Sequence, residues 1–72
     1  MITFQELSKY MKLPHPFSIH LADGREIVVP HGEFLYVNPE TGRFVVETQE
    51  VWEIFNLVTV TCLKRTKAMK KP

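Results

Sequence analysis

The side chains best suited to bind a metal ion are three histidines, His15, His20 and His31. Asp23 or Glu33 could add a carboxylate oxygen to such a site. The spacing of these residues matches no zinc signature, however, and the chain has no cysteine pair. We therefore expect neither a metal nor a cofactor, and we interpret His31 as a residue that hydrogen-bonds within its own bend.

Nucleophilic chemistry would need the single cysteine, Cys62, or one of the serines, Ser8 and Ser18. Cys62 lies in a run rich in valine and threonine, so we expect it to contact the core, where thiols are usually inert. Ser8 falls in a predicted helix, and the sequence indicates no base for Ser18. The eight carboxylates form no recognisable acid–base pair. These residues predict a protein that is not an enzyme.

Basic residues are concentrated at the C-terminal end. All eight acids and four of the nine bases lie in residues 1–63, whereas residues 64–72 contain the other five bases. The domain body is therefore near −4 and the tail near +5. Such a tail can bind nucleic acid, an acidic partner or its own body, or remain solvated and flexible. Its candidate binding residues are Lys64, Arg65, Lys67, Lys70 and Lys71.

Exposed aromatic side chains near bases can stack on nucleobases. In a chain of 72 residues most aromatic side chains are needed for the core. Tyr36 and Trp52 each carry a polar atom that favours contact with water, so these two are the candidate exposed aromatics.

The elements that must position these residues begin with a helix. Thr3-Phe4-Gln5-Glu6 has the pattern of a capping box, with Thr3 before the first helical residue and Glu6 reaching back to it. Pro14 disfavours helical geometry at the residue before it. The sequence therefore predicts one amphipathic helix over residues 4–12, with apolar residues at helical spacing: Phe4, Leu7, Tyr10 and Met11.

Residues 20–29 predict a β-hairpin and not a phosphate-binding loop, because the glycine-lysine pattern and following helix of such loops are missing. A three-residue loop ending in glycine pairs Ile19 with Ile27, whereas a two-residue loop would mix apolar and polar residues on both faces. In the chosen register His20 points outward, opposite Glu26. One face then carries Phe17, Ile19, Leu21, Ile27 and Val29.

Further strands are predicted over residues 34–37 and 44–46, joined by turn residues, and over residues 51–63, which hold one or two strands. Counting the last segment once, we expect five antiparallel strands after the helix. The predicted fold is a mainly β single domain over residues 1–63, a small five-stranded barrel, followed by the basic tail.

Three features of the sequence resemble the Sm-like fold, including its bacterial Hfq branch. They are the capped helix, the hairpin with its glycine, and the final run Phe55-Asn56-Leu57-Val58-Thr59-Val60-Thr61. An SH3-like strand order is the alternative. The resemblance implies a ring of subunits that binds uridine-rich RNA near a Tyr-Lys-His triplet. Residues 55–57 match this triplet in the aromatic alone. An acidic body also repels phosphates.

Residues 16–27 also resemble a group of uncharacterised small bacterial proteins that share a Pro-Phe-x-Ile-x-Leu-x-Asp-Gly-Arg pattern. This resemblance implies no activity.

A chain of this length buries only about 60% of the surface that its unfolded form exposes, so self-association would add to a thin core. One cysteine excludes an internal disulfide and fits a reducing cytosol. No apolar run approaches the ~20 residues that span a bilayer, and the acidic and polar N-terminus is unlike a signal peptide. We therefore expect a cytoplasmic protein-interaction or self-assembly module without membrane contact; the alternative is an RNA- or single-strand-binding module.

Overall fold

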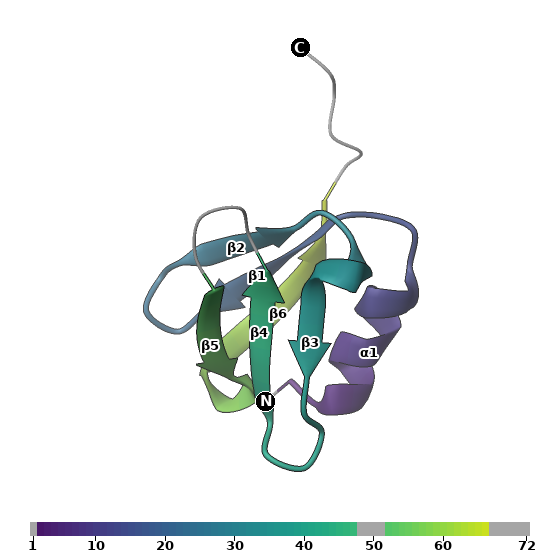
Figure 1. Ribbon diagram of the computed structural model, residues 1–72. Helices are drawn as coiled ribbons and strands as arrows, with labels where there is room; N and C mark the ends of the chain where they lie inside the picture. Colours follow the sequence, from purple (N-terminus) through teal and green to yellow (C-terminus); the bar gives the residue numbers. More distant parts are fainter. Residues whose placement is uncertain (1, 48–51, 67–72) are drawn as a thin grey trace.

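A computed structural model describes residues 2–47 and 52–66 of the chain. Within them one helix precedes six strands in two antiparallel sheets (Figure 1). One sheet has the strand order β2-β1-β6 and the other the order β3-β4-β5. The elements are α1 (Phe4–Lys12), β1 (Phe17–Leu21), β2 (Glu26–Val29), the 3-10 turn η1 (Gly32–Phe34), β3 (Leu35–Val37), β4 (Arg43–Glu47), β5 (Trp52–Asn56), the 3-10 turn η2 (Leu57–Thr59) and β6 (Val60–Arg65).

The mainly β class with an N-terminal helix is confirmed, but the five-stranded barrel is wrong in two respects. The described residues form six strands, because the segment 51–63 contains two of them separated by η2. Asn56 ends β5 by accepting a hydrogen bond from the Val58 N–H with its side chain, at 3.1 Å, while Thr59 Oγ1 donates to the Asn56 carbonyl at 2.7 Å. These bonds hold the chain in a tight turn.

The described strands also do not close into a barrel. Within the described residues β5 pairs with β4, and β6 pairs with β1, and no ladder joins β5 to β6. The two sheets instead pack against each other, with β3, β4 and β5 in front of the other sheet in Figure 1. Within the described residues the four edge strands, β2, β6, β3 and β5, therefore each pair on one side alone.

The predicted hairpin register is confirmed. Ile19 lies opposite Ile27 and His20 opposite Glu26, and the Gly24 N–H donates to the Leu21 carbonyl at 3.0 Å. Gly24 has a φ of 94°, in the left-handed region that a side chain rarely adopts. The loop therefore needs glycine at this position, as the three-residue turn predicted.

The predicted helix is confirmed with its bounds. Both bonds of the capping box are present, since the Glu6 N–H donates to Thr3 Oγ1 at 3.2 Å and the Thr3 N–H to Glu6 Oε1 at 3.0 Å. Leu7 is fully buried against the sheets. Tyr10 anchors the helix to the last strand by donating its hydroxyl to the Leu63 carbonyl at 3.4 Å.

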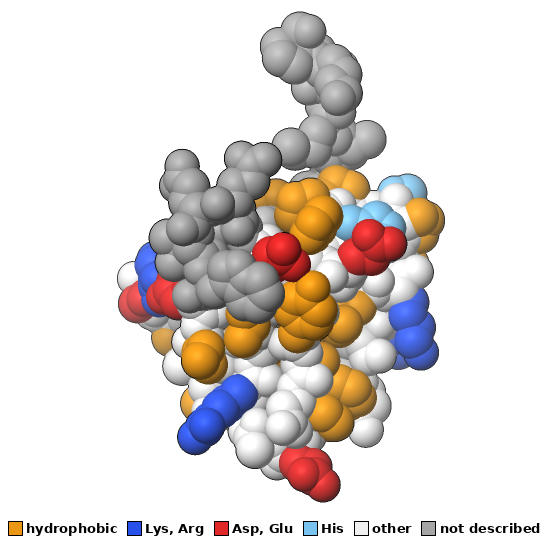
Figure 2. Space-filling view, in the orientation of Figure 1, with side chains coloured by type: hydrophobic (Ala, Val, Ile, Leu, Met, Phe, Trp, Pro, Cys, Tyr) orange, Lys and Arg blue, Asp and Glu red, His pale blue; other side chains and the backbone are white. Residues whose placement is uncertain are grey.

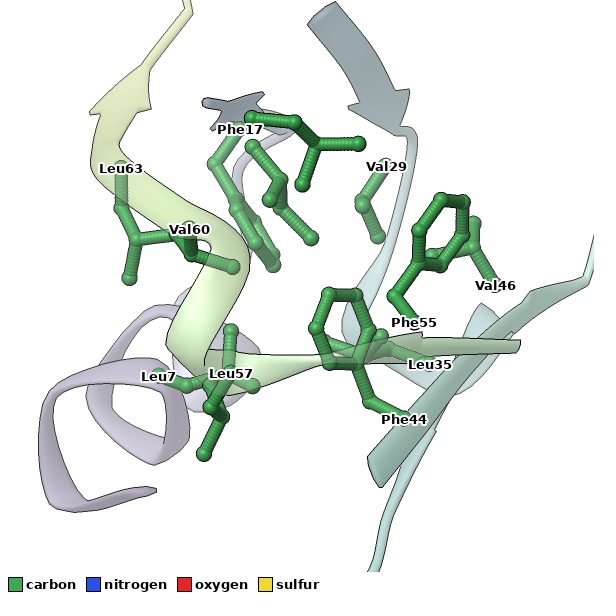
Figure 3. Packing of buried hydrophobic residues seen from close by; sticks show 12 residues of the cluster. Leu7, Phe17, Val29, Leu35, Phe44, Val46, Phe55, Leu57, Val60 and Leu63 are labelled. Atoms are coloured by element: carbon green, nitrogen blue, oxygen red, sulfur yellow. The ribbon is translucent and has the colours of Figure 1, made fainter. Parts of the chain in front are cut away.

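The core forms where the inner faces of the two sheets meet the buried side of α1 (Figure 3). The rings of Phe44 and Phe55 stack with centroids 5.2 Å apart, and Tyr10 tilts against Phe17 at 5.5 Å. The buried apolar side chains are Leu7, Phe17, Ile19, Leu21, Val29, Leu35, Phe44, Val46, Phe55, Leu57, Val60 and Leu63.

Candidate functional site

The outer face of the β3-β4-β5 sheet carries a row of apolar side chains. Tyr36 lies opposite Val45, and Val45 lies opposite Ile54, so one residue from each strand joins the row. Their neighbours along the strands, among them Leu35, Phe44 and Phe55, point inward and are buried, and successive strand residues alternate between faces. Tyr36 is 50% exposed and Ile54 70% exposed. We call Tyr36, Val45 and Ile54 the apolar row.

Charged residues lie on both sides of the apolar row on strand β4. Glu47 and Arg43 are each two residues from Val45 and therefore share its face. Figure 2 shows this face, with hydrophobic side chains over the three strands and acidic side chains beside them. The face thus combines an exposed apolar centre with one acid and one base at its margins.

The carboxylate of Glu47 holds the Tyr36 side chain in place. Its hydroxyl donates to Glu47 Oε1 at 3.0 Å. This hydrogen bond, then the charge of Glu47 and the more distant charge of Glu33, raise the pKa of Tyr36 above its ordinary value of 10.0. The hydrogen bond from the phenol to Glu47 holds the ring in place along the sheet.

The sequence identified Tyr36 as an exposed aromatic, but it missed Ile54 as a surface residue. The signal was the alternation along β5, where a buried Phe55 requires its neighbour to face outward. The second candidate aromatic, Trp52, begins β5 opposite Glu47 in the register. The position of the Trp52 side chain lies outside what the structure describes.

The candidate basic residues are only partly described. Lys64 and Arg65 lie in β6, where they pair with Ser18 and Phe17, and both are exposed. The Arg65 guanidinium lies 3.2 Å from Nε2 of His15. The remaining candidates of this group lie outside the described residues: Lys67, Lys70 and Lys71.

A second polar cluster lies on the outer face of the β2-β1-β6 sheet. Nε2 of His20 is 3.1 Å from Ser18 Oγ and 3.6 Å from Glu26 Oε2. Cys62 lies opposite His20 and is half-buried, so the expectation that it contacts the core is wrong, because the register turns it to the outer face. Sequence analysis also missed His20 as the neighbour of Ser18, although residues two apart on a strand share a face.

The Ser18–His20 pair lacks the arrangement of a nucleophile with its base. A catalytic histidine uses one ring nitrogen for the serine and the other for a carboxylate. Here the same nitrogen of His20 faces both Ser18 and Glu26. Ser18 is also only 1% exposed, and its hydroxyl lies 3.4 Å from the Lys64 carbonyl oxygen, so a substrate carbonyl has no approach to it.

An open groove of about 400 Å³ lies between β5 and the β1–β2 hairpin. Arg25 spans it, with Nη1 2.8 Å from Glu53 Oε2, Nε 2.9 Å from Asp23 Oδ2, and the guanidinium carbon 5.6 Å from the centre of the Phe55 ring. The hydrogen bond to Glu53, followed by that to Asp23, raises the pKa of Arg25. Two carboxylates neutralise this cation, so Arg25 joins the two sheets and is not an anion-binding group.

His31 hydrogen-bonds within its own bend as predicted, since the Glu33 N–H donates to its Nδ1 at 3.1 Å. Among the described residues no three His, Cys, Asp or Glu side chains gather closely enough to hold a metal ion. No helix in residues 2–47 and 52–66 is long and apolar enough to cross a membrane. In the described residues, the His31 bend and the other His, Cys, Asp and Glu side chains therefore give no candidate site besides the apolar row.

Comparisons of the chain with protein-family models, with curated proteins and with solved structures returned no match.

Proposed function

We propose that this chain is a non-enzymatic, cytoplasmic protein-interaction module that binds through the outer face of the β3-β4-β5 sheet. The observation that supports this most directly is the apolar row, with Ile54 at 70% and Tyr36 at 50% exposure on the two strands that flank β4. An exposed apolar patch with polar margins is typical of protein-binding surfaces. Three neighbouring strands present the row across the outer face of one sheet, an arrangement that suits a protein surface better than a small molecule, which binds in a concave pocket.

The fold we propose is an open, two-sheet variant of the Sm-like or SH3-like small barrel. Three features support this relationship. The first strand pairs with the last, three consecutive strands form a meander, and a single 3-10 turn leads from β5 into β6. In this variant the edges of β5 and β6 stay apart.

The proposal can be tested by photo-crosslinking in cells that express the protein. A benzophenone amino acid is placed at Ile54 and, as a matched control, at Val28, which is 43% exposed on the other sheet. We expect protein adducts at Ile54 and none at Val28, and Tyr36→Lys on the same chain should suppress them. Equal labelling at both positions, or none at Ile54, would contradict the proposal.

The alternative function is binding of single-stranded RNA or DNA through the basic C-terminal residues. The exposure of Lys64 and Arg65 at the end of β6 favours it. The carboxylate of Glu47 beside Tyr36 disfavours it on the sheet face, because it repels phosphates. Replacing Lys67, Lys70 and Lys71 by glutamine leaves β6 intact, so it separates the two functions. If the basic residues bind nucleic acid, this variant should bind oligouridine with a lower affinity than the wild type, and its affinity should depend less on salt. Fluorescence anisotropy measures both.

A further inference from the structure

We propose that the occupant of the β3-β4-β5 face is a second copy of this chain, packed face to face about a two-fold axis that runs along the apolar row. This inference rests on the proposed function and adds the identity and orientation of the partner. It comes from the charge pattern of strand β4, which is complementary to its own reversed copy.

The outward-facing residues of β4 are Arg43, Val45 and Glu47 in chain order. Residues two apart on a strand are ~6.8 Å apart, so the base and the acid lie at equal distances on either side of Val45. A two-fold axis along the apolar row reverses the strand direction of the second copy. It therefore places Glu47 of one copy over Arg43 of the other, twice in the dimer, while the apolar row meets its own counterpart.

Both charged groups are available for such a contact. Arg43 is exposed, and in the described part of the chain its guanidinium makes no hydrogen bond or ion pair. Glu47 uses Oε1 to accept the Tyr36 hydroxyl, which leaves lone pairs on the carboxylate for a second donor. Facing sheets pack ~10 Å apart with nearly aligned strands, a separation that the long Arg and Glu side chains can bridge from the margins.

Other charged residues near the face do not reverse this pattern. Glu33 lies two residues before β3, at the end of that strand nearest Glu47 in the register, and adds to the acidic end. Glu40 is exposed in the turn between β3 and β4, outside the strands that form the face. Opposite the acidic end, Asn38 and Asn56 lie level with Arg43 in the register and carry no charge. In the described part of the chain, each half of the dimer therefore offers an acidic end at Glu47 and a basic end at Arg43 to the contact.

The size of the face predicts a weak dimer. Three short strands at a spacing of ~4.8 Å give a patch of roughly 15 Å on a side. A standard interface buries about 800 Å² on each partner, more than such a patch supplies. We therefore expect association that depends on concentration in the micromolar range or above, with orientation set by the two Arg43–Glu47 pairs.

The test is a charge-reversal cycle measured by sedimentation equilibrium at low salt on the full 8.4 kDa chain. The wild type should approach twice the monomer mass as its concentration rises. Arg43→Glu and Glu47→Arg alone should each weaken the dimer about tenfold or more, because each brings like charges together. The double variant should recover the dimer to within about threefold of the wild type.

The matched control is Glu40→Arg, which makes the same charge change as Glu47→Arg in a turn outside the face. It should leave the dimer unchanged, and circular dichroism should show that every variant is folded. A monomer at all concentrations, or a dimer insensitive to both single reversals, overturns the two-fold arrangement. Photo-adducts at Ile54 whose mass differs from that of two chains would overturn it as well, yet leave the proposed function standing. If no adduct forms at Ile54, both the two-fold dimer and the proposed function are contradicted.

Discussion

At the scale of single residues, Gly32 is the one of the three glycines at which an added side chain would collide with backbone atoms. It lies in the 3-10 turn that follows β2, and a Cβ built there would overlap the carbonyl group of Met11 at the end of α1. The close approach of these two backbones lets the helix lie against the start of the second sheet. Glycine is thus required here by packing between elements.

We expect Gly32→Ala to lower the free energy of unfolding by about 1–3 kcal/mol, since the backbone of Met11 has to move to admit the methyl group. Chemical denaturation followed by circular dichroism measures this. Gly24→Ala is the comparison, because no atom lies within 4 Å of its Cβ and its cost comes from a φ of 94° alone. A Gly32→Ala variant as stable as the wild type would refute the packing argument.

The second residue-scale prediction concerns Tyr36. Its pKa is raised chiefly by the hydrogen bond to Glu47, so Glu47→Gln should lower it toward the ordinary value of 10.0. A raised pKa in the folded state contributes stability that is present below pH 10 and lost as the pH rises through the folded pKa. Glu47→Gln should therefore make the protein less sensitive to alkali.

Ultraviolet absorbance of tyrosinate measures this titration, and the sequence contains one other tyrosine, Tyr10. Tyr10→Phe, introduced into both proteins, leaves Tyr36 as the one tyrosine that the absorbance reports. Two identical titration curves for wild type and Glu47→Gln would show that the phenol–carboxylate bond is not formed in solution.

At the scale of elements, α1 depends on its first residues. The capping box satisfies the N–H groups of Thr3 and Glu6, which otherwise have no partner in the first turn. We expect Thr3→Ala to lower the free energy of unfolding by about 1 kcal/mol. Gln5→Ala, at an exposed position of the same turn, should change it little. Denaturation curves compare the two, and equal effects would contradict a specific role for the cap.

Strands β5 and β6 are separated by a local turn that ends β5. Residues 51–63 consist mostly of residues that favour strands, yet Asn56 and Thr59 hydrogen-bond locally and fold the intervening turn η2. This turn carries the chain from one sheet to the other, because β5 pairs with β4 and β6 pairs with β1. A short capped turn thus decides which sheet each strand joins.

At the scale of the whole molecule, self-association should appear in thermal stability. A dimer that binds only the folded state raises the melting temperature as protein concentration increases. We expect this rise for the wild type and for Val28→Lys, which lies on the other sheet, and its loss in Ile54→Lys. Differential scanning calorimetry over a wide concentration range measures it. A melting temperature independent of concentration in the wild type would argue against the dimer.

Local elements could be predicted from the sequence because their signals are close together in the chain. The capping box spans Thr3 to Glu6, and the hairpin register follows from alternation on either side of one glycine. Both were predicted with the correct bounds or pairing, since short-range hydrogen bonds and the burial of one face decide them.

What only the tertiary structure decided is which distant residues share a face. The apolar row joins Tyr36, Val45 and Ile54 from three strands, and its existence depends on how β4 pairs with both neighbours. Long-range strand pairing also decides that Cys62 faces away from the core and that β5 and β6 belong to different sheets. Strand patterns limit each residue to one of two faces, but the core that forms between the sheets determines which face is buried and which is left to bind.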